Sequence, residues 1–403
     1  MASEVAFAFA GAIIIIGFIG NYLFKKISIP DSLILIAIGF LAGPVFGIID
    51  VSSIRPIIPF FTSLALLVIL FDGGLNLTLD KVLLESPKAI LSALSGFLIT
   101  TLGIAGFMAV VFKFDLLASL LFGVVISDTA TVTILPLISN LKVPKELTAF
   151  LSIESLFTSP LVIVVSLVII QLITGAGSVE GGPIYLDAAR KIASAFSVGT
   201  VVGLLGGIAW VKIMRLIRNE VYNDILTLAF ALLVFAITST LGGSGEFFAL
   251  IFGLVLGNSL TIGKFFQMKN VVAISSVMRK FQTEVSFLLR TLFMVYLGLV
   301  FIVTSSSIFV YAIVITAIIF AIRYVTLNFS TKDDKIMYAH RNLLLVMIPR
   351  GLTVAVLSQR IVATNLPYAP FYSELIIAII IITTVVAAVG ASVYQYRQQR
   401  IAE

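Results

Sequence analysis

Cysteine is absent from the 403-residue sequence, and histidine occurs once, at His340. Without cysteine the chain forms neither a disulfide framework nor a thiolate metal site, and one histidine cannot build a metal cluster. The sequence also lacks a nucleotide-binding glycine loop, a dinucleotide fingerprint, a zinc-binding His-Glu helix and a serine nucleophile elbow. Paired catalytic acids and a serine–histidine pair are missing as well, so we expect neither a cofactor nor enzymatic activity.

Charged residues are scarce too. They make up 11% of the chain, whereas 60% of it is hydrophobic and the mean hydropathy is +1.17. A soluble domain is about 25% charged, so a cytosolic protein is excluded and an all-α polytopic membrane protein is expected. A helix needs about 20 residues to cross a bilayer, which leaves room for about 13 transmembrane helices with short connectors.

Long apolar runs define the predicted spans. Their approximate boundaries are 4–24, 31–49, 57–79, 88–112, 115–139, 148–174, 190–211, 225–241, 246–262, 285–303, 306–329, 341–361 and 371–396. The first run lacks the basic segment and cleavage site of a signal peptide, and we interpret it as a span. Because the spans fill the sequence, we expect a single transmembrane domain over 1–403 and no soluble regulatory domain.

Lysine and arginine are distributed unevenly between the predicted connectors. Those after odd-numbered spans, together with the C-terminal tail, hold 18 of these residues, and the opposite side holds 5. By the positive-inside rule the N-terminus is outside and the C-terminus is cytoplasmic, in a multi-pass protein of the cell membrane. The net charge of +6 therefore faces anionic membrane lipid and does not indicate nucleic-acid binding.

Two predicted spans carry polar or helix-breaking residues at their centres. Span 115–139 contains Ser127-Asp128-Thr129, and span 341–361 contains Pro349-Arg350-Gly351. Interrupted helices in matching positions of two halves point to a midplane site in a secondary transporter. The spacing predicts two inverted six-helix repeats, with broken helices crossing at the midplane, and a linker helix between them, at about 4–174, 225–396 and 190–211.

Six charged side chains are predicted to lie within the bilayer: Asp72, Asp128, Glu154, Arg290, Arg323 and Arg350. Each such charge costs at least about 2.5–3.5 kcal/mol, so it needs a partner, a watery cavity or a function. Three acids and three bases could neutralise one another as structural ion pairs, and this interpretation stays open for any one of them. A fixed cation at Arg290 would repel a cationic substrate unless an acid neutralises it.

Asp128 carries the functional prediction. Its neighbours Ser127 and Thr129 supply neutral oxygens, which a dehydrated monovalent cation needs beside a single carboxylate. Burial disfavours the charged form of a carboxylate, so we expect Asp128 to hold either a proton or a cation near neutral pH. Competition of the proton and the cation for one carboxylate is sufficient to couple cation movement in one direction to proton movement in the other. One face of the next span carries Glu154, Ser155, Thr158 and Ser159. These hydroxyls could instead be packing contacts between apolar helices.

The sequence predicts less specific roles for two further acids, Glu154 and Asp72. Glu154 is predicted to be held ionised by Arg323 or Arg350, because a guanidinium group grips a carboxylate with two hydrogen bonds. Asp72 begins the stretch Asp72-Gly73-Gly74-Leu75-Asn76, whose glycines favour a bend or a close helix approach. We interpret Asp72 either as part of an ion entry funnel or as an ordinary charge at a helix end.

Five segments together resemble the monovalent cation:proton antiporter superfamily, especially its sodium/proton exchanger and NhaP branch. In the family's order, they are Leu70-Phe71-Asp72-Gly73-Gly74-Leu75-Asn76, Ser127-Asp128, Glu154-Ser155-Leu156-Phe157, Phe293 to Leu299, and Arg323 followed by Pro349-Arg350-Gly351. The resemblance implies a fold with inverted repeats, a homodimer, and a mobile core that carries the ion in an elevator-like motion. It also implies a Glu154–Arg323 salt bridge, with Asp72, Asp128 and the nearby hydroxyls as ion ligands.

One position departs from the family pattern. After Glu154-Ser155-Leu156-Phe157 the family usually has Asn-Asp or a similar pair whose Asp binds the ion, whereas this chain has Thr158-Ser159. Either Asp128 takes over the exchange, or the protein is a transport-impaired relative, or the residue at this position has been altered. A single carboxylate would favour a weakly hydrated ion such as K+ over Na+.

The primary prediction is a secondary antiporter that exchanges Na+ or K+ for protons by alternating access and serves pH homeostasis. The predicted ligands of the monovalent cation are Asp128, Ser155 and Ser159, and the wider ion and proton site adds Ser127, Thr129, Thr158 and Asp72. The alternative is a channel-like or ion-sensing membrane protein that lacks coupled exchange.

Overall fold

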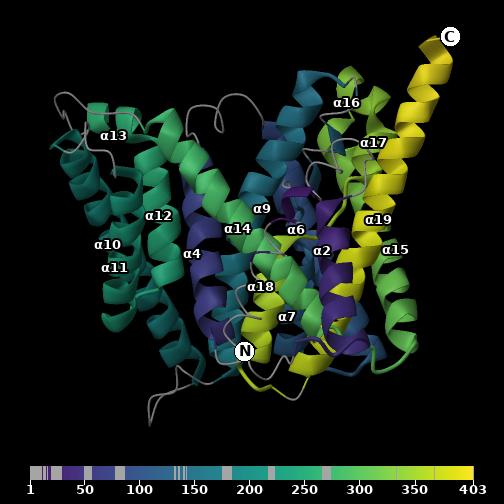
Figure 1. Ribbon diagram of the computed structural model, residues 1–403, viewed down its shortest axis with the longest axis horizontal. Helices are drawn as coiled ribbons and strands as arrows, with labels where there is room; N and C mark the ends of the chain where they lie inside the picture. Colours follow the sequence, from purple (N-terminus) through teal and green to yellow (C-terminus); the bar gives the residue numbers. More distant parts are fainter. Residues whose placement is uncertain are drawn as a thin grey trace. The chain divides into compact units, whose positions relative to one another are not determined.

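The computed structural model describes residues 11, 15, 17–19, 30–49, 57–77, 87–130, 133–134, 137–138, 141, 143–174, 184–216, 223–265, 274–332, 334–366 and 368–402. Every regular element in these ranges is helical, which confirms the all-α prediction (Figure 1). Most of the predicted first span, 4–24, lies outside the described residues.

Most long helices begin and end close to the predicted spans. The boundaries agree within six residues for α4 (Ile58–Asn76), α6 (Pro87–Val111), α9 (Lys145–Ile173), α10 (Ile184–Leu216), α11 (Asn223–Thr240), α15 (Ser307–Thr331) and α19 (Ala369–Ala402). In the described part of the chain, eight helices are long and apolar enough to cross a membrane, or up to nine if one bent pair is a single span. The polytopic prediction is confirmed, and the total of about 13 stays a prediction.

One helix begins earlier than predicted. Hydropathy places the start of this span at 285, whereas α14 (Ser276–Val300) starts nine residues sooner. Charged residues such as Arg279 lower the local hydropathy and hide this part of the helix from a sequence scan. The helix continues there because Met278 and Gln282 are buried, so one face of these turns packs against protein.

The chain divides into two compact units. Unit 1 comprises Met1–Thr62, Ser86–Val162 and Leu288–Glu403, and unit 2 comprises Ser63–Glu85 and Ile163–Phe287. The helices α4, α9 and α14 each contribute a part to both units. All the residues predicted around Asp128 belong to unit 1, whereas Asp72 belongs to unit 2.

Unit 1 contains the two spans that the sequence predicts to be interrupted at their centres. In it, α7 (Leu116–Ile126) packs against α6, and α18 (Leu352–Val362) packs against α19 and α7. The contact between α6 and α7 is close, since a β-carbon added at Gly123 would overlap the carbonyl oxygen of Thr101. Small residues of this kind let helices pack backbone to backbone, which is how helices associate where lipid removes the hydrophobic driving force.

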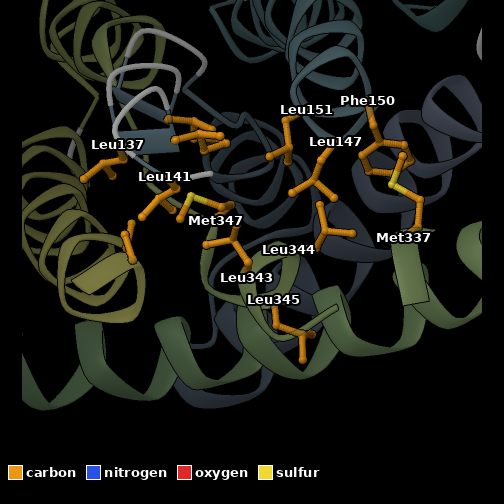
Figure 2. Packing of buried hydrophobic residues seen from close by; sticks show 14 of the residues in the cluster. Leu137, Leu141, Leu147, Phe150, Leu151, Met337, Leu343, Leu344, Leu345 and Met347 are labelled. Carbon is orange, nitrogen blue, oxygen red and sulfur yellow. The ribbon is translucent and has the colours of Figure 1, made fainter. Parts of the chain in front are cut away.

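A cluster of buried apolar side chains fixes the short helices that lead to the second interruption, α16 (Lys335–Ala339) and α17 (Arg341–Val346). In Figure 2 the cluster runs from Leu137 and Leu141 on the left to Phe150 and Met337 on the right. Its other labelled members are Leu147, Leu151, Leu343, Leu344, Leu345 and Met347. The cluster therefore packs the start of α9 against the end of α17, next to the residues where α17 stops.

The crossing of α2 (Asp31–Phe40) and the second part of α14 is also tight. A β-carbon at Gly39 would overlap the carbonyl oxygen of Val295, and one at Gly298 would overlap that of Ile36. A short π-helix, η1 (Leu41–Val45), continues α2. The two glycines hold the helices at a distance at which side chains on either side of the crossing can meet.

A buried ion pair lies on this crossing. Arg290 Nη2 donates to Asp31 Oδ2 at 2.6 Å, and both side chains are largely buried. The sequence left Arg290 without an assigned acid, because Asp31 stands at the predicted start of a span and was not counted among the charges at bilayer depth. The structure supplies that acid, so Arg290 is not an uncompensated cation.

Unit 2 is built from α10, α11 and α12 (Gly245–Gly257), which lie side by side (Figure 1). A bend of 81° separates α12 from α13 (Ser259–Phe265), so the predicted span 246–262 is interrupted near its end. A β-carbon at Gly74 would overlap the carbonyl oxygen of Leu250 on α12, which confirms the close helix approach predicted at this glycine.

We expect Asp31→Asn to lower the melting temperature of the detergent-solubilised protein, because Arg290 then keeps its buried charge without this acid. Breaking a buried ion pair from one side costs about 3 kcal/mol or more. The control is Glu284→Gln, which breaks an exposed pair with Lys280 at 3.9 Å. Exposed pairs contribute about 0–1 kcal/mol, so equal melting temperatures for the two variants would contradict the assignment.

Candidate functional site

The first interruption follows α7. This helix begins after Asp115, whose carboxylate accepts a hydrogen bond from the amide of Ala118 at 3.1 Å and caps the helix. Its last turn closes at Ser127, whose hydroxyl donates to the carbonyl of Val124 at 2.6 Å. Residues 128–130 then continue without helical structure, as the polar stretch in this span predicted. Asp128 is therefore carried by unwound backbone inside unit 1.

The second interruption lies between α17 and α18, at residues 347–351. The two unwound segments contact each other, since the amide of Ala130 donates to the carbonyl of Pro349 at 3.0 Å. A β-carbon at Gly351 would stand 2.5 Å from that of Ala130, so a larger residue does not fit there without movement. Unwound backbone at membrane depth has to find partners within the protein, and each segment here supplies one to the other.

Asp128 is 1% exposed and is surrounded by neutral hydrogen-bond donors. Its Oδ1 accepts from the hydroxyl of Ser159 at 2.7 Å and from that of Thr158 at 3.4 Å. The hydroxyl of Thr353 and the amide of Thr129 also interact with this carboxylate. Among the residues that the structure describes, no base forms an ion pair with Asp128 within 4.0 Å. Hydroxyl groups thus take the positions that an ion-pair partner would fill.

The remaining predicted hydroxyls hold the unwound segment to its neighbours. Ser155 Oγ donates to the carbonyl of Thr129 at 2.6 Å and connects α9 to this segment. The hydroxyl of Thr129 accepts from Arg350 Nη1 at 3.4 Å. The structure therefore brings Ser127, Thr129 and Ser155 together with the segment that carries Asp128, and their contacts run largely through the backbone.

Glu154 and Arg323 meet directly in unit 1. Arg323 Nη1 bonds to Glu154 Oε1, and Nη2 donates to Oε2 at 2.8 Å. The hydroxyl of Ser92 donates to the same Oε1 at 2.9 Å, and Arg323 Nε donates to the carbonyl of Leu344 at 3.2 Å. A two-pronged guanidinium–carboxylate pair is strong and directional. Both carboxylate oxygens of Glu154 are occupied by this arrangement.

Arg350 is not a member of this ion pair, although the sequence left it as a candidate. Its Nη1 donates to the hydroxyl of Thr129 and, at 3.2 Å, to the carbonyl of Ile348. The guanidinium interacts electrostatically with both Asp128 and Glu154 at longer range. The structure thus gives Glu154 a direct partner in Arg323, whereas the bonds of Arg350 go to neutral oxygens.

A small cavity lies beside these charged groups. Its size allows about one water molecule. Apolar side chains of α6 and α15 form one part of the wall, and the polar part comes from Thr100, Ser127, Thr129, Glu154, Thr158, Arg323, Thr326 and Arg350. The cavity gives the hydroxyls around the unwound segment a polar space next to Arg350.

Asp72 has its polar partners in unit 2. The amide of Asn76 donates to Asp72 Oδ1 at 3.1 Å, and Asn76 Oδ1 accepts from Arg279 Nη1 at 3.0 Å. Arg279 also reaches the carbonyl of Leu75 at 3.5 Å. Asn76 thus bonds to both Asp72 and Arg279 and connects the acid to the guanidinium group. The role of Asp72 as an ion ligand stays a prediction.

Sequence reasoning missed three residues of these groups. Thr353 interacts with Asp128, Ser92 donates to Glu154, and Asp31 pairs with Arg290. Thr353 stands three positions after Arg350, close enough to the predicted break that its hydroxyl could have been noticed. No pattern in the sequence distinguishes Ser92 from the other serines of its apolar helix.

We expect Glu154→Gln to destabilise the protein by about 3 kcal/mol, because Arg323 is left as a buried charge without its acid. The double variant Glu154→Gln/Arg323→Gln should be more stable than Glu154→Gln alone, since it removes both charges. Melting curves of the wild type, both single variants and the double variant complete the cycle. Strictly additive effects would contradict a direct ion pair.

Proteins with similar sequences are antiporters by name. The K(+)/H(+) antiporter NhaP2 of Shewanella oneidensis is 30% identical over 246 residues, which are 60% of this chain and 42% of that protein. The Na(+)/H(+) antiporter 1 of Methanocaldococcus jannaschii is 26% identical over 303 residues, 73% of this chain and 68% of that protein. The chain thus spans less than half the length of the first relative.

The fold is similar to a solved antiporter structure. The sodium proton antiporter MjNhaP1 of Methanocaldococcus jannaschii, solved at pH 8, superposes with a TM-score of 0.72 at 21% sequence identity. The superposition covers 96% of this chain and 100% of that one. This likeness supports the polytopic helical architecture.

A family pattern extends over almost the whole sequence. The family described as "Sodium/hydrogen exchanger, transmembrane" matches residues 11–394, a range that includes both interrupted helices and the Glu154–Arg323 pair. The match confirms the resemblance read from the sequence motifs. The chain belongs to the transmembrane sodium/hydrogen exchanger family.

Proposed function

We propose that this chain exchanges Na+ or K+ for protons across a membrane, with the two ions competing for Asp128. One observation carries the proposal: Asp128 is a buried carboxylate on an interrupted helix, in contact with hydroxyl groups, and no base of the described part of the chain lies within ion-pair distance of it. A carboxylate in this setting favours neutralisation by whichever cation can reach it, a proton or a metal ion. The names of the two sequence relatives, a K(+)/H(+) and a Na(+)/H(+) antiporter, support the same class of transport.

The proposed mechanism is alternating access. An ionised Asp128 is costly to carry through apolar surroundings, whereas a protonated or cation-loaded Asp128 is less so. If the site changes the side of the membrane to which it opens only when Asp128 is neutralised, each cation moved one way is matched by a proton moved the other way. The inverted repeats expected from the sequence would provide two related states for this change.

The proposed cation ligands are Asp128, Ser155 and Ser159. Ser127, Thr129 and Thr158 complete the wider ion and proton site around the unwound segment, and Asp72 is a further proposed ligand. The Glu154–Arg323 pair has a structural role in this proposal, since it joins α9 to α15. A site with one free carboxylate and neutral hydroxyls favours K+ over the more strongly hydrated Na+.

We also propose the setting in which the exchange takes place. The distribution of lysine and arginine supports an outside N-terminus and a cytoplasmic C-terminus. The family supports a homodimer in the cell membrane, embedded in lipid, with a role in pH homeostasis. No cofactor enters the proposed mechanism, because proton and cation binding to oxygen ligands involves no covalent step.

Asp128→Asn should abolish cation-dependent proton movement in proteoliposomes loaded with a pH-sensitive dye. Asparagine keeps the shape of the side chain but can bind neither a proton nor a cation by charge. The matched control is Asp224→Asn, the same substitution in the first turn of α11 in unit 2. Cation-dependent proton movement at the wild-type rate in Asp128→Asn would show that Asp128 is not the exchange residue.

The alternative function, a channel-like or ion-sensing relative without coupled exchange, is favoured by the serine at position 159. Ser159→Asp tests it, since Ser159 Oγ lies 2.7 Å from Asp128 Oδ1 and a carboxylate there would join Asp128 at one site. We expect apparent cation affinity to rise about tenfold, because a second negative charge acts at short range. The neutral control is Ser159→Asn.

The wild-type protein supplies the deciding comparison in the same assay. Exchange that is already present before the substitution supports Asp128 as a sufficient carrier. Exchange that appears only in Ser159→Asp would favour the transport-impaired alternative.

A further inference from the structure

We propose that Arg350 is a fixed counter-cation for Asp128, which competes with the transported ions and weakens the binding of both. The inference deepens the proposed function, because it rests on Asp128 as the exchange residue and assigns a specificity-determining role to a second side chain. It concerns the affinity of the site for cations and protons. Four features of unit 1 support it.

The first feature is the position of the Arg350 backbone. Arg350 lies on the unwound segment 347–351, which is bonded to the Asp128 segment through Ala130 and Pro349. Its own amide donates to the hydroxyl of Thr383 at 3.2 Å. Because both segments are held by these bonds, the charge of Arg350 is fixed close to the segment that carries Asp128.

The second feature is the surroundings of the guanidinium group. Arg350 is 3% exposed, and its hydrogen bonds go to neutral oxygens, the hydroxyl of Thr129 and the carbonyl of Ile348. Its Nε is buried and has no hydrogen-bond partner among the residues that the structure describes. Within the described ranges, no acid lies within 4.0 Å of the guanidinium. A buried arginine that makes no ion pair keeps its full charge available at longer range.

The third feature is the shortage of other acids. Glu154 is occupied on both oxygens by Arg323 and on one of them by Ser92. Within the described part of the chain, Asp128 is consequently a nearby acid that forms no ion pair, and it interacts electrostatically with Arg350. Thr129 follows Asp128 directly in the chain, and its hydroxyl accepts from Arg350 Nη1 at 3.4 Å, so one residue connects the two groups.

The fourth feature is the balance of charge. Two acids and two bases make up this buried group: Asp128 and Glu154, Arg323 and Arg350. When Asp128 is ionised, Arg350 compensates part of its field at longer range, so an entering cation or proton is bound less tightly than by a carboxylate with no cation nearby. Adding a second positive charge near a fixed one is unfavourable in a medium of low dielectric constant. Arg350 therefore reduces the affinity of Asp128 for both transported ions.

The test is Arg350→Gln in proteoliposomes, with initial rates measured against the concentrations of K+ and Na+ at several pH values. Removing the fixed charge should lower the KM for the transported cation about tenfold or more. It should also move the pH at which protons suppress exchange upward by about one unit, since proton binding strengthens for the same reason. The matched control is Arg360→Gln, near the end of α18, the helix that follows the segment of Arg350, and its KM should be unchanged.

Arg350→Lys provides a second readout if the glutamine variant does not fold. Lysine keeps a positive charge at neutral pH, but unlike a guanidinium group it can lose its proton at alkaline pH. The cation KM of this variant should fall relative to wild type as pH rises, because the fixed charge disappears during the titration. A ratio of the two KM values that stays constant from neutral to alkaline pH would overturn the proposal.

A purely structural role for Arg350 gives a different pattern. In that case Arg350→Gln lowers the maximal rate and the melting temperature and leaves both the KM and the pH profile in place, which would also overturn the proposal. Failure of the proposed function is separate, since it shows as normal exchange in Asp128→Asn whatever the Arg350 variants do.

Discussion

The hydrogen bond between the amide of Ala130 and the carbonyl of Pro349 joins two interrupted spans where the backbone of each no longer forms helical hydrogen bonds. Backbone that leaves a helix in apolar surroundings has to find partners inside the protein. Here the two unwound segments partly satisfy each other, and Gly351 permits the close approach that this requires. The positions of Asp128 and Arg350 follow from this contact, because each stands within two residues of one of the bonded groups.

The charges near this contact fall into two kinds. Glu154 and Arg323 bond through two prongs and form a closed pair between α9 and α15. Asp128 and Arg350 carry opposite charges that interact at longer range, and each is in contact with hydroxyl groups. A direct pair is rigid, whereas two charges separated by hydroxyls leave the carboxylate open to an ion from solution. The same group of residues thus combines a direct pair with one that interacts at longer range. In the proposed function, the absence of a carboxylate at Ser159 leaves Asp128 as the acid on which exchange depends.

The parts of this arrangement that follow a local pattern could be predicted from the sequence. Polar residues at the centre of apolar spans predicted both interruptions, and long apolar runs predicted helices such as α6 and α15. Contacts between distant segments could not be predicted in this way. Asp31 stands at a helix start, so nothing local marks it as the partner of Arg290. Spacing along the chain also could not decide whether Arg323 or Arg350 pairs with Glu154. Three-dimensional packing decides this, by bringing both Nη atoms of Arg323 to the Glu154 carboxylate.

Proton release on cation binding tests the central claim most directly. The detergent-solubilised protein is titrated with K+ or Na+ in weakly buffered solution, and the protons released are measured together with the cation bound. Competition for one carboxylate predicts close to one proton released for each cation bound at pH values where Asp128 is protonated, and none in a variant whose residue 128 is asparagine. Saturable cation binding to the wild-type protein without proton release at any pH would contradict the account.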